Sequence, residues 1–528
     1  MEQIENTVDV LIAGAGPAGL MMACQLVLQH ISFRIIDPKD SPAMHSGALI
    51  VHGRTLEIFH QMGLGEKAIS EGIIAKKINI QFAHKKNIEI DMDDFGKQLT
   101  RYPYLLMLEQ WRTENLLIAF LNEHGHNVCN GTALMTFSQE TELVTAKIKH
   151  PDGTIEVVKS RFIIGADGHN SLVRSQMNIP FPGKTHLARL FITDCQASLP
   201  LPCGEIFFSF NSSYTVGCFP LRNERYRIDG LIPLLQERKE VHFDDVRNYF
   251  KVKIDSGIVL CNPQWFSVFR SHSRCADAFR KKCCFLIGDA AHVHSPVGAQ
   301  GMNTALQDAF NLAWKLAFFI KGKAKEKVLD TYQAERRPLA LRIIRYTDIA
   351  FNFMTAGSFL SGFFRMQLMP MLLPKLLIRF RENTTIRNYL FTSVSGIGIK
   401  YRHSLLSGSS SGNFPVHSPR PGERLPYLAY PEDGKSSMLG DGWGSQSFHL
   451  LIFGNQKLPH PFQLVVEEFS DVLSLKFIAL DSRTRALYDR LGMKDEGCYL
   501  VRPDGYIAWR SIGFNALSLG NYLQNILK

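Results

Sequence analysis

The stretch VDVLIAGAGPAG, residues 8–19, decides the fold of the N-terminal part of this chain. Residues 8–13 form a continuous apolar run, which is typical of a strand buried in a parallel sheet. The glycine-rich turn leads into an apolar stretch, residues 18–29, that favours a helix, and residues 33–36 favour a second strand. Strand, glycine turn, helix and strand in this order predict a βαβ unit of the Rossmann type.

The glycines of that turn have the spacing of a dinucleotide-binding site. The first glycine permits a tight turn, the second lets the backbone approach a pyrophosphate, and the third lets helix and strand pack closely. The helix N-terminus offers N–H groups to the phosphates, and an acid at the end of the second strand can hold a ribose. The candidate residues here are Gly14, Gly16, Pro17, Ala18, Gly19 and Asp37.

Two further glycine-rich segments follow predicted strands. The first, Gly-Ala-Asp-Gly at 165–168, comes after the apolar run 162–164 and contains Asp167. In the second, a strand at 285–287 delivers an acid that suits sugar hydroxyls, and residues 295–303 then open a long helix predicted over 302–321. Small residues there let a flat ring lie against backbone, near the positive end of the helix. The candidates in this segment are Gly288, Asp289, Pro296, Gly298, Gly301, Met302 and Asn303.

The composition excludes several classes of protein. The chain has 528 residues, 45% of them hydrophobic, and a net charge of +10 without any long basic run, so we expect no nucleic-acid partner. Its ten cysteines form no C-x-x-C and no zinc-type spacing, so we expect thiols in a reducing cytosol and no metal site. The acidic N-terminus and the short apolar runs predict a cytoplasmic protein with no signal peptide and no transmembrane segment.

Two of these segments carry a resemblance to a known family. GADGHNSLVR, residues 165–174, and GDAAHVHSPVGAQGMN, residues 288–303, resemble the FAD-dependent aromatic-ring hydroxylases, which are class A flavin monooxygenases. The tail LVRPDGYIAWR, residues 500–510, resembles the subgroup with a thioredoxin-like third domain, which includes phenol, pentachlorophenol, polyketide and rifampicin hydroxylases. Because this tail region lacks a C-x-x-C, the resemblance implies a structural role or a dimer contact there rather than thioredoxin chemistry.

The resemblance implies a mixed α/β fold of three units. They are a Rossmann-type FAD-binding domain with a helical layer (1–75, 103–180 and 276–395), an antiparallel-sheet substrate domain (76–102 and 181–275) and a thioredoxin-like domain (396–528).

It also implies roles for single residues. The first glycine segment and Asp37 would hold the ADP half of FAD, Gln110 would lie near the ribityl and flavin region, and Asp289 would bind the ribityl chain. Residues 296–303 would cradle the ring, and Asp167 would support FAD and the binding of NAD(P)H. The implied reaction is hydroxylation of a small phenolic or polyketide-like substrate with FAD, O2 and NAD(P)H, NADPH being favoured, through a flavin hydroperoxide. A homodimer is favoured weakly.

Two other classes of function stay open from the sequence. One is another FAD-dependent reaction, such as halogenation or reduction of a double bond, although the W-x-W-x-I-P segment of flavin halogenases is absent. The other is a flavin-binding interaction protein whose apolar segment 349–377 docks on a membrane or a partner.

The chain departs from the family pattern at two positions. The family usually has an arginine where this chain has Gly47, and often has two glycines where Gly298 and Ala299 stand. The first change removes a charge near the cofactor, and the second adds a methyl group near the ring.

No catalytic base can be singled out. The candidates are the histidines His45, His52, His272, His292 and His294. Residues 207–210 with Tyr214 and Phe219 form an aromatic set that lines either a substrate pocket or the core.

Overall fold

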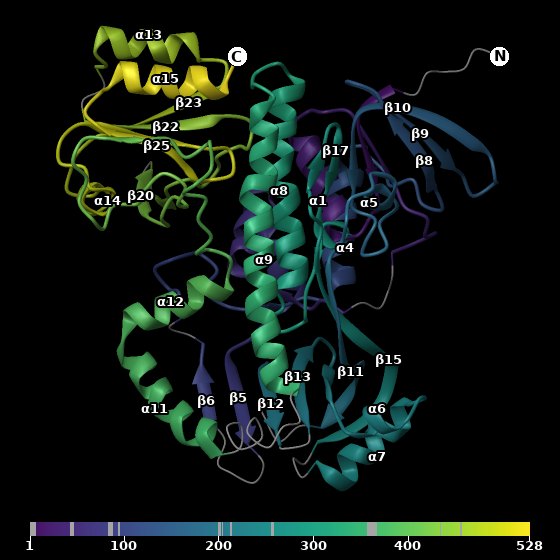
Figure 1. Ribbon diagram of the computed structural model, residues 1–528. Helices are drawn as coiled ribbons and strands as arrows, with labels where there is room; N and C mark the ends of the chain where they lie inside the picture. The colour runs from purple at the N-terminus through teal and green to yellow at the C-terminus, as the bar shows by residue number, and fades with distance from the viewer. Residues whose placement is uncertain are drawn as a thin grey trace.

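The computed structural model describes residues 7–42, 47–82, 88–92, 95–198, 202, 204–211, 214–254, 258–355, 367–432, 435–454 and 457–528. Figure 1 shows two long central helices, a sheet domain below them and a second α/β unit beside their upper ends. The overall mixed α/β fold predicted from the sequence is confirmed. The domain boundaries given above stay a prediction.

The first sheet contains the predicted βαβ unit. Strand β1 (Thr7–Ala13) pairs in parallel with β2 (Phe33–Ile36) on one side and with β10 (Ile155–Gly165) on the other. The sheet order is β16-β17-β10-β1-β2, where β16 is Arg280–Lys281 and β17 is Cys284–Leu286. Strands β8 (Ala133–Gln139) and β9 (Val144–Lys149) extend β10 as an antiparallel ribbon.

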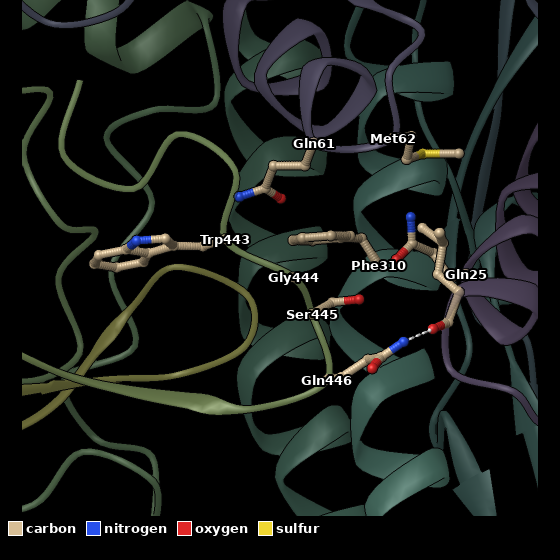
Figure 2. Close-up of a pocket in the computed structure, with 9 residues that line it drawn as sticks. Gln25, Gln61, Met62, Phe310, Trp443, Gly444, Ser445 and Gln446 are labelled. Carbon is tan, nitrogen blue, oxygen red and sulfur yellow. Dashed lines mark hydrogen bonds between the residues drawn. The ribbon is translucent and has the colours of Figure 1, made fainter. Parts of the chain in front are cut away.

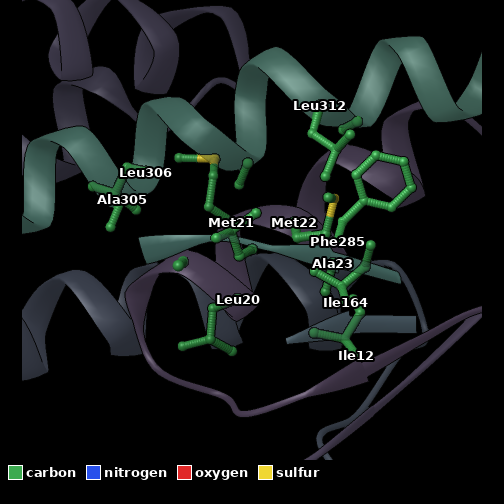
Figure 3. Packing of buried hydrophobic residues seen from close by; sticks show 14 of the residues in the cluster. Ile12, Leu20, Met21, Met22, Ala23, Ile164, Phe285, Ala305, Leu306 and Leu312 are labelled. Atoms are coloured by element: carbon green, nitrogen blue, oxygen red, sulfur yellow. The ribbon is translucent and has the colours of Figure 1, made fainter. Parts of the chain in front are cut away.

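Helix α1 (Pro17–Leu28) is the centre of the largest hydrophobic core. Its side chains Met21 and Met22 lie between the parallel sheet and helix α8 (Gln300–Ile320), as Figure 3 shows. The helix is apolar on every side, which is the pattern of a helix buried between two layers. This packing fixes the N-terminus of α1 at the ends of β1 and β10, where the glycine motifs lie.

The second sheet is mostly antiparallel and has the order β18-β15-β11-β14-β13-β12-β5-β6. Its longest strands are β11 (Gly183–Ser198) and β15 (Val259–Cys275). The other strands are β5 (Lys77–Phe82), β6 (Ile88–Asp91), β12 (Glu205–Phe210), β13 (Thr215–Leu221), β14 (Arg225–Leu231) and β18 (His292–Val293). Helices α6 (Leu234–Glu237) and α7 (Phe243–Lys253) belong to the same domain, and α7 covers one face of the sheet.

Helices α8 and α9 (Lys327–Thr355) run side by side through the middle of the molecule (Figure 1). The remaining helices near the first two sheets are α2 (Gly53–Gln61), α3 (Gly65–Glu71), α4 (Gln110–Glu123), α5 (Leu172–Gln176), α11 (Met369–Glu382) and α12 (Thr384–Val394). The apolar segment 349–377 belongs to α9 and α11 at its ends, and residues 356–366 within it lie outside the described residues. None of the described helices is long and apolar enough to cross a membrane.

The C-terminal unit has the topology of a thioredoxin fold. Its sheet order is β19-β25-β24-β22-β23, with β22 (Phe448–Phe453) parallel to β23 (Leu473–Ile478) and antiparallel to β24 (Gly497–Val501). The strand β25 (Ile507–Ile512) and the helices α13 (His460–Glu468), α14 (Arg485–Leu491) and α15 (Ala516–Ile526) complete it. The thioredoxin-like domain predicted from the tail is confirmed, and Cys498 is the only cysteine in its sequence.

Two segments of this unit differ from what their sequence predicts. The apolar residues 477–480 predict a strand, but β23 begins four residues earlier, because Leu473 and Leu475 already pair with β22. The stretch 407–421, which reads as a linker, contains β19 (Ser410–Ser411), whose backbone pairs with β25. Its serines and glycines therefore belong to the edge of the C-terminal sheet.

Candidate functional site

The first glycine motif forms a tight junction between β1, α1 and β10. Gly14 has φ +104°, and a Cβ atom there would lie 2.3 Å from the carbonyl oxygen of Ala166. At Gly19 a Cβ would lie 1.9 Å from the carbonyl oxygen of Gly14. At Gly16, in contrast, a Cβ would meet nothing within 4 Å. Gly14 and Gly19 are therefore required for packing, whereas Gly16 leaves open space above the N-terminus of α1.

The second glycine motif packs directly on the first. The carbonyl oxygen of Ala13 accepts a hydrogen bond from the backbone N–H of Ala166 at 2.8 Å. Asp167 accepts hydrogen bonds from the N–H groups of Leu172 (2.7 Å) and Val173 (3.1 Å) in the first turn of α5, whose N-cap residue is Ser171. Burial raises the pKa of the Asp167 carboxyl. The position of Asp167 is therefore explained by local structure, and its predicted part in NAD(P)H binding stays a prediction.

The third motif joins the other two through Gly288 and Arg174. A Cβ at Gly288 would lie 3.0 Å from Cβ of Ala18, which shows how closely this turn approaches α1. The Arg174 guanidinium donates to the carbonyl oxygens of Ala290 (2.9 Å) and His169 (2.7 Å). The three segments singled out in the sequence thus meet at one end of the parallel sheet.

Asp289 differs from the other acids at this junction. Its side chain is exposed, and no side chain of the described residues is found to hydrogen-bond with it. Protein nevertheless surrounds it, and this burial raises the pKa of its carboxyl. A carboxylate that is open to solvent is available to a ligand, and the part of Asp289 in binding the ribityl chain stays a prediction.

The N-terminus of α8 forms the other wall of the site. Pro296 and Gly298 are exposed, and a Cβ at Gly301 would meet nothing nearer than 3.9 Å, so this backbone is accessible. Ala299 caps the helix in the left-handed conformation, with φ 51° and ψ 39°. Since L residues other than glycine rarely adopt this conformation, a second glycine would fit here with less strain.

Asn303 and Met302 are buried rather than open to a ligand. The Asn303 amide donates to the carbonyl oxygens of Ile50 (2.8 Å) and Ala299 (2.9 Å), and it accepts from the N–H of His52 (2.9 Å). It also accepts from the hydroxyl of Thr55, so its side chain is fully used. Asn303 therefore fixes segment 50–55 against α8, and any part in binding a ring would fall to backbone.

Asp37 and Gln110 lie at the opposite side of the glycine turn. Asp37 accepts a hydrogen bond from the N–H of Ala15 at 2.7 Å, which holds the turn. Gln110 begins α4 and donates to Glu114 at 2.8 Å. Burial raises the pKa of Glu114, and the neighbouring Asp37 adds to the rise while Lys39 opposes it. Asp37 and Glu114 are therefore close to each other beside the glycine turn.

The structure sorts the histidine candidates by their partners. His292 is buried and bonded to Asp308 at 2.7 Å, and His272 is bonded to the Thr185 hydroxyl. His52 contacts the carbonyl oxygen of Gly298 at 3.2 Å, and burial lowers its pKa to about 4. Burial likewise lowers the pKa of His294 to about 4. His45 lies outside the described residues. His52 and His294 are therefore neutral near pH 7.

The aromatic set of the second sheet divides between its two faces. Phe207 and Tyr214 are buried in the core beneath α7, so for them core packing is the correct alternative. Phe208, Phe210 and Phe219 point to the opposite face, where they are only partly buried. The ring centroids of Phe208 and Phe219 are 5.6 Å apart, with an interplanar angle of 86°. We call this second surface the aromatic face.

The aromatic face adjoins the cofactor-binding part of the molecule. Phe208 and Phe219 pack with Leu49, Ile50 and Met107, and Ile50 is the residue held by Asn303. The aromatic face thus lies next to residues 49–50, which Asn303 links to the start of α8. This neighbourhood brings a partly open aromatic surface toward the three glycine motifs.

Sequence reasoning missed the charged residues of this face. Arg227 on β14 pairs with Asp194 on β11 through two contacts of 2.8 Å, and both are nearly fully buried. Arg227 also donates to the carbonyl oxygens of Gly47 and Ala48 at 3.1 Å. Arg227 therefore places a guanidinium from another element beside the backbone of Gly47. The available signal in the sequence was a pair of charged residues at alternate positions of one strand, 227 and 229.

Figure 2 shows a pocket that is separate from the site described above. It lies between α1, α8 and the loop before β22, and its lining includes Gln25, Phe310, Trp443 and Gln446. Its lining residues on α1, Gln25 and Leu28, lie at the end of that helix away from the glycine turn, and the pocket marks the junction with the C-terminal unit.

Two family models match the chain. Residues 7–347 match the FAD binding domain model, and residues 418–527 match the model of the aromatic-ring hydroxylase C-terminal domain. Among curated relatives, the chain is 31% identical to a 6-methylpretetramide 4-monooxygenase of Streptomyces rimosus, over 95% of this chain and 90% of that protein. It is 28% identical to a rifampicin monooxygenase of Rhodococcus hoagii, over 95% of both chains.

A solved structure agrees with these matches. The OxyS anhydrotetracycline hydroxylase from Streptomyces rimosus superposes with a TM-score of 0.77 at 29% identity, covering 98% of this chain and 99% of that one. The match therefore includes the FAD-binding part, the second sheet and the thioredoxin-like unit together. From the family models and this likeness along the whole chain, we conclude that the protein is an FAD-dependent monooxygenase of the aromatic-ring hydroxylase family.

Proposed function

We propose that this chain hydroxylates a polycyclic phenolic compound, of the size of a polyketide, with NADPH and O2 as co-substrates. The observation that carries the proposal is the aromatic face, where Phe208, Phe210 and Phe219 stay partly open next to the segment that leads to α8. Aromatic side chains offer broad apolar contact to a flat ring system. The relatives described above, a 6-methylpretetramide 4-monooxygenase and a rifampicin monooxygenase, are named for compounds of this size class, which supports the proposal.

The residues present fit FAD. The backbone at Gly16 leaves room for a pyrophosphate at the N-terminus of α1, where N–H groups are available to it. Asp289 is open to hydroxyl groups of a ribityl chain, and the accessible backbone at Gly298 and Gly301 suits a flat ring. When bound, FAD supplies the electron transfer and the reaction with O2.

The chain itself must then bind the substrate, exclude water and handle protons. The aromatic face can orient a flat substrate, and the Arg227–Asp194 pair fixes the sheet against segment 47–48. Since His52 and His294 are neutral near pH 7, they can accept a hydrogen bond but add no positive charge beside α8.

The proposal is tested with purified protein loaded with FAD. NADPH and NADH oxidation and O2 uptake are measured with a tetracyclic phenol, with phenol itself, and without an aromatic compound. We expect NADPH to be used faster than NADH, and the tetracyclic phenol to give a hydroxylated product. Oxidation that no aromatic compound stimulates, or product from phenol alone, would contradict the proposed substrate class.

Three finer properties belong to the same proposal. A homodimer would be supported by a doubled mass in light scattering, and a cytoplasmic location by cell fractionation. The assignments of Gln110 and Asp167 to FAD and NAD(P)H binding are supported by resemblance, together with their positions beside the glycine turn. FAD titration of variants at the two positions tests them.

A further inference from the structure

The aromatic face contains an acid, Asp229, that lies close to aromatic side chains. Asp229 lies on β14, opposite Gly217 on β13 and Ile192 on β11. A Cβ at Gly217 would lie 2.9 Å from Asp229 Oδ1, 2.9 Å from Phe219 Cε2 and 3.2 Å from Phe208 Cε1. The Asp229 carboxylate and the edges of two phenyl rings therefore converge on the space that a side chain at Gly217 would fill.

On this face, Asp229 lies midway between two contacts that join the sheet to other segments. On one side, Arg227 donates to the carbonyl oxygens of Gly47 and Ala48. On the other side, the Thr215 hydroxyl donates to the carbonyl oxygen of Met354, near the end of α9. Residues two apart on a strand point to the same face. Asp229 therefore points to the same face as these two contacts and lies between them. A ligand seated on the aromatic face would meet this carboxylate.

The groups around Asp229 leave it without a side-chain partner. Arg227, on its own strand, is the nearby charge, but its guanidinium is occupied by Asp194 and by two carbonyl oxygens. On β13, the buried thiol of Cys218 points to the other face, and burial holds its pKa well above the ordinary value. Among the described residues, no side chain donates a hydrogen bond to Asp229, which is only partly buried.

We propose that Asp229 binds the phenolic hydroxyl of the aromatic substrate and accepts its proton during ring hydroxylation; this rests on the proposed function. The O–H bond of the phenol breaks, its electron pair stays on the phenol oxygen, and the proton passes to the Asp229 carboxylate. The resulting phenolate ring is the more electron-rich nucleophile. The proton returns to the phenol oxygen before the product leaves, so Asp229 is regenerated as a carboxylate.

The acidity of the group agrees with this geometry. Burial raises the pKa of Asp229 to about 7, although the charge of Arg227 opposes the rise. A base is most effective when its pKa lies near the working pH. The raised pKa of Asp229 therefore suits a base that works near neutral pH.

A binding experiment tests the contact without requiring turnover. 2-Hydroxyanthraquinone, whose phenol ionises near neutrality with a change of colour, is bound to the FAD-loaded enzyme and titrated with base. In the wild type, the phenolate band should grow in two steps, because two interacting acids lose their protons as a pair. With Asp229→Asn the band should grow in one step. Asp244→Asn, the same change at an exposed position on α7, should titrate like the wild type.

Two results would overturn the inference in this experiment. One is a single step at the same pH in all three proteins, which would mean that the phenol does not meet Asp229. The other is a wild type that fails to bind 2-hydroxyanthraquinone, which would exclude this ligand class. FAD content and melting temperature of each variant establish that it is folded.

A kinetic experiment separates proton transfer from simple positioning. Asp229→Asn should lower the rate of NADPH-dependent hydroxylation by about 10²–10⁴-fold, the usual contribution of a general base. Fluorinated analogues of the same phenol, which lose their proton more easily, should recover much of the rate in Asp229→Asn and little in the wild type. Equal losses with every analogue would contradict a role as base.

The same data distinguish failure of the inference from failure of the proposed function. If the wild type hydroxylates and Asp229→Asn behaves like Asp244→Asn, the function stands and the inference fails. If no phenol is hydroxylated but the titration shows two coupled steps, the contact stands and the proposed function fails.

Discussion

Acids in two regions of the molecule have opposite surroundings. Where the C-terminal unit meets the central helices, Glu335 is paired with Lys315 at 2.8 Å and with Arg502 at 2.6 Å, and all three side chains are fully buried. Asp504 completes the cluster from the C-terminal side. On the aromatic face, the Asp229 carboxylate and the edges of two phenyl rings converge over Gly217, and the guanidinium of the neighbouring Arg227 is bonded to Asp194.

The difference shows in the acidity of the two groups. Burial alone would raise the pKa of Glu335, but the charges of Arg502 and Lys315 outweigh it and hold the pKa well below its ordinary value. For Asp229 the burial effect prevails. A buried acid that is fully paired specifies how two units dock. An acid with a shifted pKa that has no side-chain partner and lies in a partly open face is a candidate for chemistry.

The largest effect is expected from breaking the paired cluster. Arg502→Met leaves Asp504 buried without its guanidinium, and removing one partner of a buried pair costs about 3–5 kcal/mol. The loss should appear as a lower free energy of unfolding in urea. Arg483→Met, which removes an exposed arginine paired only with Asp481, is the matched control and should change little. Equal stability of the two variants would mean that the cluster does not hold the units together.

The next effect concerns two acids at the glycine motifs. Asp289→Ala should weaken FAD binding by about 1–3 kcal/mol if a ligand hydroxyl loses its acceptor. Asp167→Ala should affect FAD less and stability more, by about 1 kcal/mol, because it removes the acceptor of two N–H groups in the first turn of α5. FAD titration of each apoprotein and thermal unfolding measure the two quantities. A larger affinity loss for Asp167→Ala would reverse the assignment of the two acids.

The raised pKa of Asp229 gives a dependence of stability on pH. Because the folded state holds this proton more tightly than the unfolded chain, its contribution to stability is present below about pH 4 and is lost as the pH rises to about 7. Asp229→Asn should therefore be more stable than the wild type at pH 8, by about 1 kcal/mol, since a partly buried carboxylate keeps some solvent. Urea unfolding at pH 5 and pH 8 checks this, and a variant that is less stable at pH 8 would refute it.

The smallest effect on stability is expected at Gly47. A Cβ there meets nothing within 4 Å, so Gly47→Arg should change the free energy of unfolding by less than about 0.5 kcal/mol. The added charge would stand beside Arg227, whose guanidinium already contacts this backbone. We expect Gly47→Arg to slow the oxidation of NADPH in the absence of substrate. Anaerobic flavin reduction measures that rate, and equal rates in both proteins would exclude a clamp at this position.

Much of the fold follows from local patterns in the sequence. The glycine segment at 14–19 predicts its own βαβ unit because Gly14 and Gly19 meet steric demands of the turn and Gly16 leaves space beside it. The C-terminal topology was available only through the resemblance of its tail, since β22, β24 and β25 are buried strands without a distinctive period.

The candidate site was less accessible to sequence reasoning, for a physical reason. Asn303 and Asp167 lie in the right motifs, yet their side chains are used in contacts with segments 50–55 and 172–173. Asp229 gains its character from Gly217 and Phe208, which lie on other strands, and strand register is not visible in a single sequence. The shifted pKa of Asp229 therefore depends on long-range strand pairing rather than on a local sequence pattern.

The central claim is that the aromatic face and the glycine motifs serve one hydroxylation reaction. The most direct test supplies the FAD-loaded enzyme with NADPH, a tetracyclic phenol and isotopically labelled O2, and analyses the product by mass spectrometry. The account predicts a product that carries one labelled oxygen atom on its ring, in an amount that matches the NADPH consumed. Unlabelled product, or NADPH consumption that yields only hydrogen peroxide with every phenol, would contradict it.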